Sequence, residues 1–281
     1  MTELSIIDTG RRFGGLDRLY GPDSVARLRH GHVAVAGIGG VGSWCVEALA
    51  RCGVGRLTLI DLDHVAESNL NRQAHALEST LGQAKISAMA NRIRDINSAC
   101  DVVEVDDFVE PENVDRVIPT GADFVIDCTD QAPAKIAMIL QSRRRQQALL
   151  VCGGAGGKTN PLALRSGDLS QAVNDALLAK LRNTLRRQHG FPKASDAAGK
   201  PRKRVPRMHV RSLWFDQPAI LPTSWTAPSV VCDVTGPAEA PQGLSCAGYG
   251  SVMMVTATMG LAAADEAVHW LLQGRLQEPR C

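Results

Sequence analysis

The 281-residue sequence predicts an α/β protein with a Rossmann-like, doubly wound and mostly parallel sheet, a C-terminal extension and a basic insertion. Two observations predict this class. Short β-branched runs alternate with helical patterns through the first half of the chain, which is typical of βαβ units. A composition of 44% hydrophobic and 21% charged residues supplies a sizeable core and excludes a disordered or low-complexity chain.

The predicted strands are short apolar runs at 33–36, 57–61, 102–105, 124–127 and 149–152. A helix is predicted after the first strand, because apolar residues lie on one face and Gly53 ends the pattern. The apolar residues are Trp44, Cys45, Ala48, Leu49 and Cys52. Helical spacing of Ile86, Met89, Ile93 and Ile96 predicts the next helix. Helices are also expected over 171–188 and roughly 250–273, separated by a long Pro-, Gly- and base-rich insertion with a short strand or two.

A glycine-rich turn joins the first predicted strand to its helix. Gly37, Gly39, Gly40 and Gly42 let the backbone turn tightly and approach a phosphate, and the following helix N-terminus favours an anion. Asp61 lies at the end of the next strand, where an acidic residue can bind ribose hydroxyls. These features fit any Rossmann-type nucleotide binder, an NAD-dependent oxidoreductase included. A glycine turn without a ligand is the structural alternative.

The residues that follow Asp61 favour triphosphate chemistry over hydride transfer. They include the polar and charged side chains of Asp63, Asn71, Arg72, Lys85 and Asp130. Arg and Lys neutralise charge that develops on phosphoryl oxygens, and Asp can hold Mg²⁺, whereas hydride transfer needs no such cluster. The alternative for the cations is a role as surface charges.

Five segments carry a family resemblance that covers about residues 10–273 and is weakest across 190–235. They are Arg12-Phe13-Gly14-Gly15-Leu16, Gly37-Ile38-Gly39-Gly40-Val41-Gly42-Ser43-Trp44, Asp106-Asp107-Phe108-Val109, Gly153-Gly154-Ala155-Gly156-Gly157-Lys158 and Cys246-Ala247-Gly248-Tyr249-Gly250-Ser251. Together they resemble the adenylating domain of the ubiquitin-activating and molybdopterin-synthase adenylyltransferase superfamily. The more specific similarity is to its tRNA threonylcarbamoyladenosine dehydratase branch.

The resemblance implies a role for each matching residue. The glycine turn would cradle the phosphates of ATP, Asp61 would hold the ribose beside Asp63, and Asp130 would position Mg²⁺. The triphosphate would be contacted by Asn71, Arg72 and Lys85, the two cations stabilising the pentavalent α-phosphorus. The resemblance also divides the chain into an N-terminal arm and helix (1–30), an ATP-binding adenylating domain (31–168) and a C-terminal part with a basic insertion and terminal helix (169–281).

Two further features are implied only by the resemblance. An N-terminal arginine of the superfamily reaches across a homodimer, and Arg12 is the matching residue. Arg11 and Arg18 are nearby candidates for the same role, and the alternative for Arg12 is that it is a solvated residue near the N-terminus without a role in the site. The family is also associated with a bound monovalent cation, Na⁺ or K⁺, for which the sequence contains no short motif.

The implied reaction is adenylation followed by ring closure. The threonyl carboxylate of the modified tRNA adenosine would attack the α-phosphate of ATP, giving an acyl-adenylate and pyrophosphate. An internal nitrogen or oxygen would then close onto the activated carbonyl and expel AMP, an intramolecular step that needs no cysteine nucleophile.

Eight cysteines without a CxxC pair predict no zinc site. This absence counts against the rival hypothesis, an adenylyltransferase acting on a ubiquitin-like or sulfur-carrier protein. Cys232 and Cys246 lie where a thioester-forming residue would be sought, with structural burial as the alternative. Charged residues throughout the first thirty positions and free thiols indicate a cytoplasmic location. A cysteine-desulfurase and sulfur-acceptor system is retained as a candidate partner.

Residues 244–264 form a stretch without a charged side chain, and this stretch is long enough for a membrane span. Several Ser, Thr and Gly residues interrupt the stretch, and Asp265 and Glu266 follow it directly. A span would be richer in Leu, Ile and Phe. We therefore expect a buried or dimer-interface helix and no membrane partner.

The net charge of +2 conceals a basic segment. Residues 180–211 contain eleven basic side chains and one acidic side chain, a net +10 that leaves −8 for the rest of the protein. Phosphate contacts supply most sequence-independent affinity for nucleic acid, so this segment is a candidate tRNA footprint, centred on Arg202, Lys203, Arg204 and Arg207. A solvated loop is the alternative. Arg143-Arg144-Arg145 at a helix end is a second candidate.

Overall fold

The sheet contains seven strands in the order β3-β2-β1-β4-β5-β7-β6. The computed structural model describes residues 8–196, 198–222 and 248–274. The strands are β1 (His32–Ala36), β2 (Arg56–Ile60), β3 (Asp101–Val105), β4 (Phe124–Asp127), β5 (Ala148–Cys152), β6 (Leu164–Asp168) and β7 (Arg211–Phe215). All neighbours pair in parallel except β6 and β7. The predicted mostly parallel α/β class is therefore confirmed.

The register of the parallel strands aligns their carboxyl ends. Ala36 of β1 pairs with Ile60 of β2 and with Asp127 of β4, and Asp127 pairs in turn with Val151 of β5. Chain segments that leave β2, β1, β4 and β5 therefore begin at one level along a single edge of the sheet. Ligands of open α/β sheets bind at this edge, where the strand order reverses.

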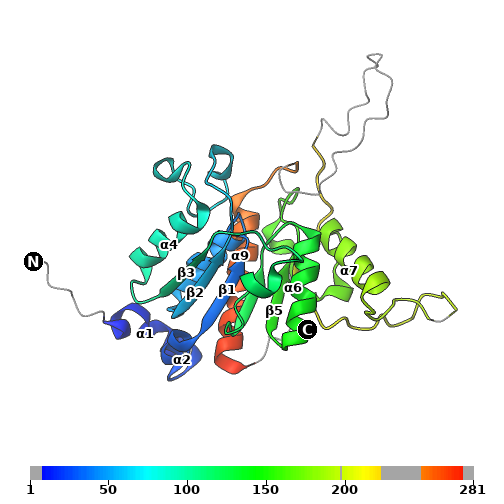
Figure 1. The fold of residues 1–281 in the computed structure, drawn as a ribbon, viewed down its shortest axis with the longest axis horizontal. Coiled ribbons are helices and arrows are strands. Elements are labelled where there is room, and N and C mark those ends of the chain that lie inside the picture. The colour runs from blue at the N-terminus through cyan, green and yellow to red at the C-terminus, as the bar shows by residue number, and fades with distance from the viewer. Residues whose placement is uncertain (1–7, 197, 223–247, 275–281) are drawn as a thin grey trace, which may run out of the picture.

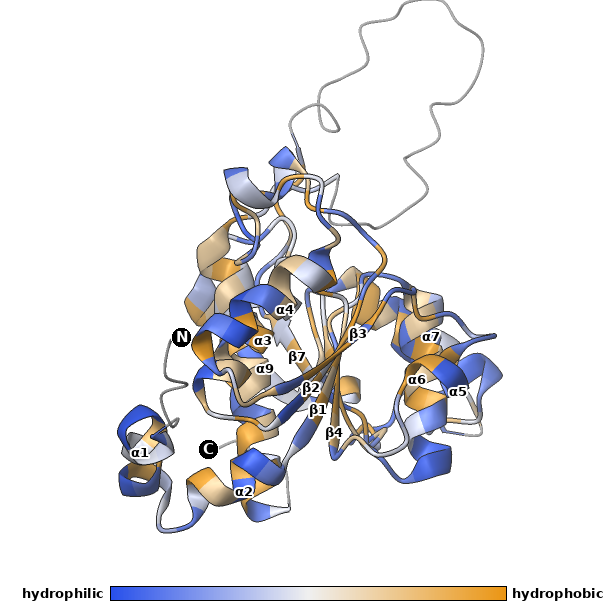
Figure 2. Cartoon of the chain, turned by 60° about the vertical axis from the view of Figure 1, so that its left-hand side comes forward, coloured by the Kyte–Doolittle hydropathy of each residue, from blue (hydrophilic) through white to orange (hydrophobic). Residues whose placement is uncertain are grey.

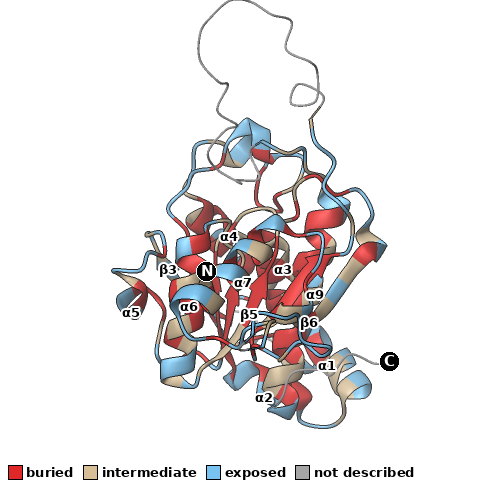
Figure 3. Cartoon of the chain, turned by 90° about the vertical axis from the view of Figure 1, so that its right-hand side faces the viewer, coloured by how far each residue is buried: buried red, intermediate tan, exposed pale blue. Residues whose placement is uncertain are grey.

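Helices cover both faces of the sheet. They are α1 (Thr9–Tyr20), α2 (Ser24–His30), α3 (Gly42–Arg51), α4 (Lys85–Ile96), α5 (Val114–Val117), α6 (Ala132–Arg145), α7 (Ala176–Gln188) and α9 (Met253–Gln273). Figure 2 shows α3, α4 and α9 on one side of the apolar strands and α5, α6 and α7 on the other. The buried residues lie between these layers (Figure 3), because each helix turns one apolar stripe toward the sheet.

The helix α9 packs along α3, the helix that follows the glycine turn. Its buried positions include Val255, Met259, Ala263 and Ala267. Gly260 lies at the crossing, where an added Cβ would overlap the Val41 carbonyl and lie 2.9 Å from the Cys45 nitrogen. Residues 253–264 thus belong to a helix buried against the body of the protein. No helix of the described ranges is long and apolar enough to cross a membrane.

The expected helix over 171–188 begins later, at Ala176, because the side chain of Asp175 caps it by accepting a hydrogen bond from the Leu178 nitrogen at 2.9 Å. After α7 the chain forms a short hairpin in which Ser195 bridges Pro201. This segment extends beyond α7 at the right of Figure 1. The insertion contributes the single strand β7 within its described part, and positions 223–247 lie outside the described residues.

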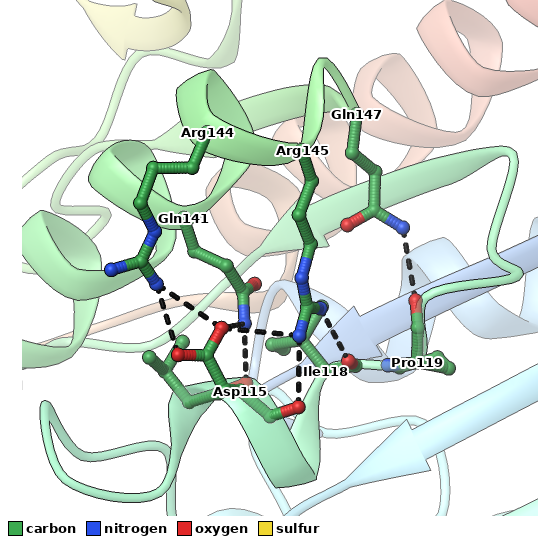
Figure 4. A network of polar contacts seen from close by, with 8 residues as sticks. Asp115, Ile118, Pro119, Gln141, Arg144, Arg145 and Gln147 are labelled. Carbon is green, nitrogen blue, oxygen red and sulfur yellow. Dashed lines mark hydrogen bonds and ion pairs between the residues drawn. The ribbon is translucent and has the colours of Figure 1, made fainter.

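The three consecutive arginines at the end of α6 make different contacts. Arg144 and Arg145 both pair with Asp115 of α5, at 3.0 and 3.1 Å, and Arg145 also donates to the Ile118 carbonyl at 2.9 Å (Figure 4). Arg143 instead lies 4.5 Å from the centre of the Phe191 ring. Two of these three charges therefore connect α6 to α5, and this cluster is chiefly structural.

Five cysteines lie in the described ranges, and all are free thiols: Cys45, Cys52, Cys100, Cys128 and Cys152. Burial raises the pKa of the Cys45 and Cys100 thiols, which disfavours their thiolate forms. Cys232 and Cys246 lie outside the described residues.

Candidate active site

A cavity of about 880 Å³ opens over the aligned carboxyl ends of β2, β1, β4 and β5. It is lined from each of these strand ends in turn, by Asp61 after β2, the glycine turn after β1, Asp130 after β4, and the segment 153–156 with Lys158 after β5. The strand order therefore sets the order of the lining groups along the cavity.

The glycine turn approaches the neighbouring strand end very closely. Gly37 has φ of +84°, and an added Cβ would lie 2.9 Å from the backbone of Cys128 and from the Thr129 nitrogen. Gly37, Gly39 and Gly40 line the cavity, whereas Gly42 is buried at the start of α3, where a Cβ would overlap the Gly37 carbonyl. The turn and the N-terminus of α3 therefore lie beside the cavity, as in sites where backbone N–H groups bind a phosphate.

Asp61 connects β2 to the glycine turn. One carboxylate oxygen accepts a hydrogen bond from the Ile38 nitrogen at 2.6 Å and the other from the Asp63 nitrogen at 2.9 Å. Burial raises the pKa of Asp61, although the nearby Lys85 ammonium opposes that shift. The side chain also lines the cavity, so it fixes the turn and remains within reach of a ribose.

The cations Arg72 and Lys85 both line the cavity. Lys85 is buried at the first position of α4, and its ammonium lies 2.6 Å from the Asp63 carboxylate. Arg72 donates to the Asn71 side chain at 3.0 Å, and no described carboxylate pairs with its guanidinium. The cavity therefore combines one paired and one unpaired cation beside the glycine turn.

Asp130 follows β4 and lines the cavity between the glycine turn and the β5 end. Its carboxylate accepts a hydrogen bond of 3.3 Å from the Gln131 amide. No three His, Cys, Asp or Glu side chains of the described ranges are grouped as a metal site. Mg²⁺ commonly uses one or two carboxylates together with substrate phosphates and water, so the single carboxylate of Asp130 fits such an ion.

Three groups of predicted residues lie outside the cavity. Arg12 is exposed on α1, and Asn71 is exposed and donates to the Ser251 carbonyl at 2.9 Å. The candidate tRNA-binding residues are exposed on the segment after α7: Arg202, Lys203, Arg204 and Arg207. Within one chain, the structure therefore brings Asp61, Asp63, Arg72, Lys85 and Asp130 together with three of the four glycines.

Five charged residues of the cavity had no role assigned from the sequence: Asp107, Glu110 and Glu112 after β3, and the two buried side chains of Lys158 and Asp175. Lys158 is buried and donates to the carbonyls of Asn174 and Gln217, the former at 2.8 Å. Asp175 accepts a hydrogen bond from the Gly154 nitrogen at 2.8 Å. The sequence signals for these two buried side chains were the glycine-rich run that ends at Lys158 and an Asp at a helix start, and neither signal indicates that the two side chains share a cavity.

The comparison with known proteins agrees with this geometry. Residues 15–280 match the ThiF family, and the chain belongs to it. A tRNA threonylcarbamoyladenosine dehydratase from Escherichia coli K12 is 41% identical over 259 residues, 92% of each chain. One from Haemophilus influenzae is 39% identical over 264 residues, 94% of each chain. Within the ThiF family, the chain therefore belongs to the tRNA threonylcarbamoyladenosine dehydratases.

Solved structures lead to the same family. The Escherichia coli dehydratase in complex with ATP has a TM-score of 0.79 and 36% identity, covering 96% of this chain and 97% of that one. Its complex with AMP has the same TM-score and identity, covering 97% and 99%. These similarities favour the adenylating interpretation over an NAD-dependent oxidoreductase.

Proposed function

We propose that this protein is an ATP-dependent ligase-type enzyme that dehydrates and cyclises threonylcarbamoyladenosine in tRNA through a carboxyl-adenylate. The main support is the cavity, whose lining groups over β2, β1 and β4 fit a nucleotide and lie beside further polar groups over β5. The near full-length similarity to dehydratases, one of them solved with ATP and with AMP, supports this reaction.

The nucleotide half of the cavity suits the first step. The amides of the glycine turn would hold the phosphates, and Asp61 would hold the ribose. Arg72 and Lys85 would stabilise the charge that develops on the α-phosphoryl oxygens as the threonyl carboxylate attacks. Pyrophosphate leaves in this step. In the acyl-adenylate the carbonyl carbon then carries AMP, which is a far better leaving group than the hydroxide or oxide of a free carboxylate.

Mg²⁺ belongs to this proposal through Asp130. Its carboxylate lies on the cavity wall and would hold the ion together with phosphate oxygens. The ion would supply charge neutralisation for the triphosphate. We also propose a monovalent cation, Na⁺ or K⁺, as a ligand on the basis of the family resemblance alone.

We propose a homodimer in which Arg12 acts on the partner's cavity. Arg12 is exposed on α1 and does not line the cavity of its own chain, so only a second copy could bring it to a nucleotide. This assignment gives residues 1–30 a role in assembly, residues 31–168 the nucleotide chemistry and residues 169–281 a role in binding tRNA.

The segment after α7 supplies the proposed tRNA surface. Asp196, its one acidic residue, accepts hydrogen bonds from the Ala198 and Lys200 nitrogens at 2.9 Å and thereby closes the hairpin turn. Apart from Arg211, which pairs with Glu266, no basic side chain of 180–211 forms an ion pair within the described ranges. These charges are therefore available to phosphates, Arg202, Lys203, Arg204 and Arg207 foremost.

Two proposals concern the cellular setting. We propose a cytoplasmic enzyme, since tRNA is its substrate. We also propose a cysteine-desulfurase and sulfur-acceptor system as a partner, which is supported only by the family resemblance of the sequence. Pull-down of purified desulfurase components on immobilised protein would test this partnership.

Mass spectrometry of tRNA nucleosides tests the function directly. Threonylcarbamoyladenosine-bearing tRNA is incubated with ATP and Mg²⁺, with and without the protein. The expected product is lighter by one water and appears together with AMP and pyrophosphate. An unchanged nucleoside, with pyrophosphate exchange stimulated instead by a small carrier protein, would support the sulfur-carrier alternative. Tight NADH binding without ATP turnover would refute both adenylation hypotheses.

A further inference from the structure

Asp175 is a buried carboxylate on the wall of the cavity. One oxygen accepts from the Leu178 nitrogen at 2.9 Å and the other from the Gly154 nitrogen at 2.8 Å. Gly153 has no room for a side chain, since a Cβ would overlap the Asp175 carboxylate. The carboxylate is thus held against the end of β5 from two directions, and each oxygen retains a lone pair.

The sheet order places Asp175 on the side where the acyl group must lie. Asp61 follows β2, the glycine turn follows β1, Asp130 follows β4 and Gly154 follows β5. Three strand spacings separate β2 from β5, or ~14 Å. A nucleotide whose ribose lies at Asp61 and whose phosphates lie on the glycine turn therefore directs its α-phosphate, and anything joined to it, toward β5.

The other carboxylates of the cavity are committed or distant. Asp63 pairs with Lys85, and Asp107 pairs with Arg116 at 2.6 Å. Asp61 follows β2, three strands away from β5, and Asp130, which follows β4, would face the phosphates. The remaining ones are Glu110 and Glu112, exposed after β3 at the opposite end of the cavity. Asp175 is the one described cavity carboxylate on the acyl side.

We propose that Asp175 is the general base of the ring closure, an assignment that rests on the function proposed above. As the internal nitrogen or oxygen forms its bond to the acyl carbon, the bond from that carbon to the AMP oxygen breaks, and AMP leaves with the electron pair. The urea N–H of the threonylcarbamoyl group loses its proton, which Asp175 accepts and later releases to water. A base held within hydrogen-bond reach of the proton accelerates such a step by about 10²–10⁴-fold.

The surroundings of Asp175 suit a base that must be ionised yet basic. Burial raises the pKa of this carboxyl group, whereas the amides of Leu178 and Gly154 lower it. The cations that face it are Lys158 from the loop after β5 and Lys135 from α6, and both also lower the pKa. Lys135 is also paired with Asp127 at 3.0 Å, whereas the Lys158 ammonium interacts with both Asp175 and Asp216, and Asp175 raises its pKa more than Asp216 does.

Separating the two half-reactions tests the assignment. Excess protein is mixed with ATP and threonylcarbamoyladenosine-bearing tRNA, and pyrophosphate, AMP and cyclised nucleoside are quantified in one turnover. For Asp175→Asn we expect pyrophosphate release within ~3-fold of the unaltered protein, but AMP and cyclised nucleoside formation slower by about 10²-fold or more. Ring closure by the unaltered protein should slow at low pH, around a pKa above the ordinary Asp value, and the variant should lose this dependence.

Two further variants separate chemistry from folding. Asp175→Ser keeps a good helix N-cap and removes the carboxylate, so it should reproduce the effect even where the Asn variant is unstable. Asp123→Asn alters a carboxylate that accepts a hydrogen bond from the His32 nitrogen at 2.8 Å and does not line the cavity; both half-reactions should stay unchanged.

The contrary outcomes are equally distinct. Ring closure within ~3-fold of the unaltered protein in both Asp175 variants, or equal loss of both half-reactions, would refute the base assignment. Absence of pyrophosphate release from the unaltered protein would instead overturn the proposed function, and the base assignment with it.

Discussion

The two cations beside the glycine turn have different local partners. Lys85 is buried and pairs with Asp63, whereas Arg72 is partly exposed and is bound mainly to carbonyl and amide oxygens nearby. A cation already positioned by a carboxylate needs no reorganisation when charge develops on a phosphate. Lys85 is therefore the residue on which adenylation should depend most strongly.

Replacing Lys85 by Met tests this dependence. We expect ATP–pyrophosphate exchange to fall by about 10²–10³-fold, because one preorganised charge is lost. Stability should change little, since Asp63 is half-exposed and water can solvate its carboxylate. Arg94→Met, which removes a half-exposed cation paired with Glu104 on the same helix, is the matched control. Exchange at the unaltered rate would remove Lys85 from the site.

A buried histidine makes stability depend on pH. Burial, with Lys85 and Arg92 nearby, lowers the pKa of His75 to about 4, and neither ring nitrogen has a hydrogen-bond partner among the described residues. Between the ordinary value near 6.5 and about 4, the unfolded chain binds a proton that the folded one does not. The free energy of unfolding should therefore fall as pH decreases through this window, by up to about 3 kcal/mol.

Substituting His75 by Leu should remove this part of the pH dependence. Urea unfolding measured at several pH values between about 7.5 and 4.5 would show a shallower loss of stability in the variant. The exposed His189 provides the control, since His189→Leu should leave the slope unchanged. Identical slopes for the two variants would contradict the explanation.

At the scale of elements, β1, β2, β4 and β5 were predictable because each is a largely apolar run with most of its residues buried. The edge strand β3 was predictable from its valines, although none of its residues is buried. The same reasoning could not find β6, since this antiparallel edge strand is mostly polar, Gly167 is its only buried residue, and it lacks such a run. The residues of the cavity were likewise predictable only where a local sequence motif marks them. Glycines and Asp61 follow from local motifs, whereas the position of Asp175 depends on β5 lying beside β4, which only the folded sheet shows.

The contact between α3 and α9 should control the glycine turn. Gly260→Ala would force its Cβ against the Val41 carbonyl, immediately after the turn, and lower the free energy of unfolding by about 1–3 kcal/mol. Displacement of Val41 should also raise KM for ATP. Denaturant unfolding and exchange kinetics would measure both, with Leu261→Val on the exposed side of the same helix as control. An unchanged KM would show that the packing of α9 on α3 does not control the glycine turn.

At the scale of the whole molecule, charge is divided between a body of −8 and a basic segment of +10. The arginine pair at Asp115 shows why counting charges is insufficient, because Arg144 and Arg145 share one carboxylate within the body. The cations of the segment after α7 have no such partners in the described ranges, Arg211 excepted. Affinity for tRNA should therefore depend on this segment and on ionic strength.

Reversing Arg202, Lys203 and Arg204 to Glu tests this division. Binding of tRNA should weaken, and the slope of log affinity against log salt should become shallower by roughly 2–3, about one per lost phosphate contact. Exchange activity at saturating tRNA should persist. The same charge reversal at Arg29, Arg56 and Arg94, on α2, β2 and α4, is the control. Equal effects of both sets would show that only net charge matters.

The packing of α9 on α3 also has a consequence for biosynthesis. Helix α3 is made early, directly after β1, whereas the helix that covers its apolar face is made after every strand of the sheet. Proteins begin to fold from the N-terminal side during translation. On the ribosome, the nascent nucleotide-binding half therefore exposes an uncovered apolar strip until α9 emerges, and we expect it to interact with chaperones during that interval.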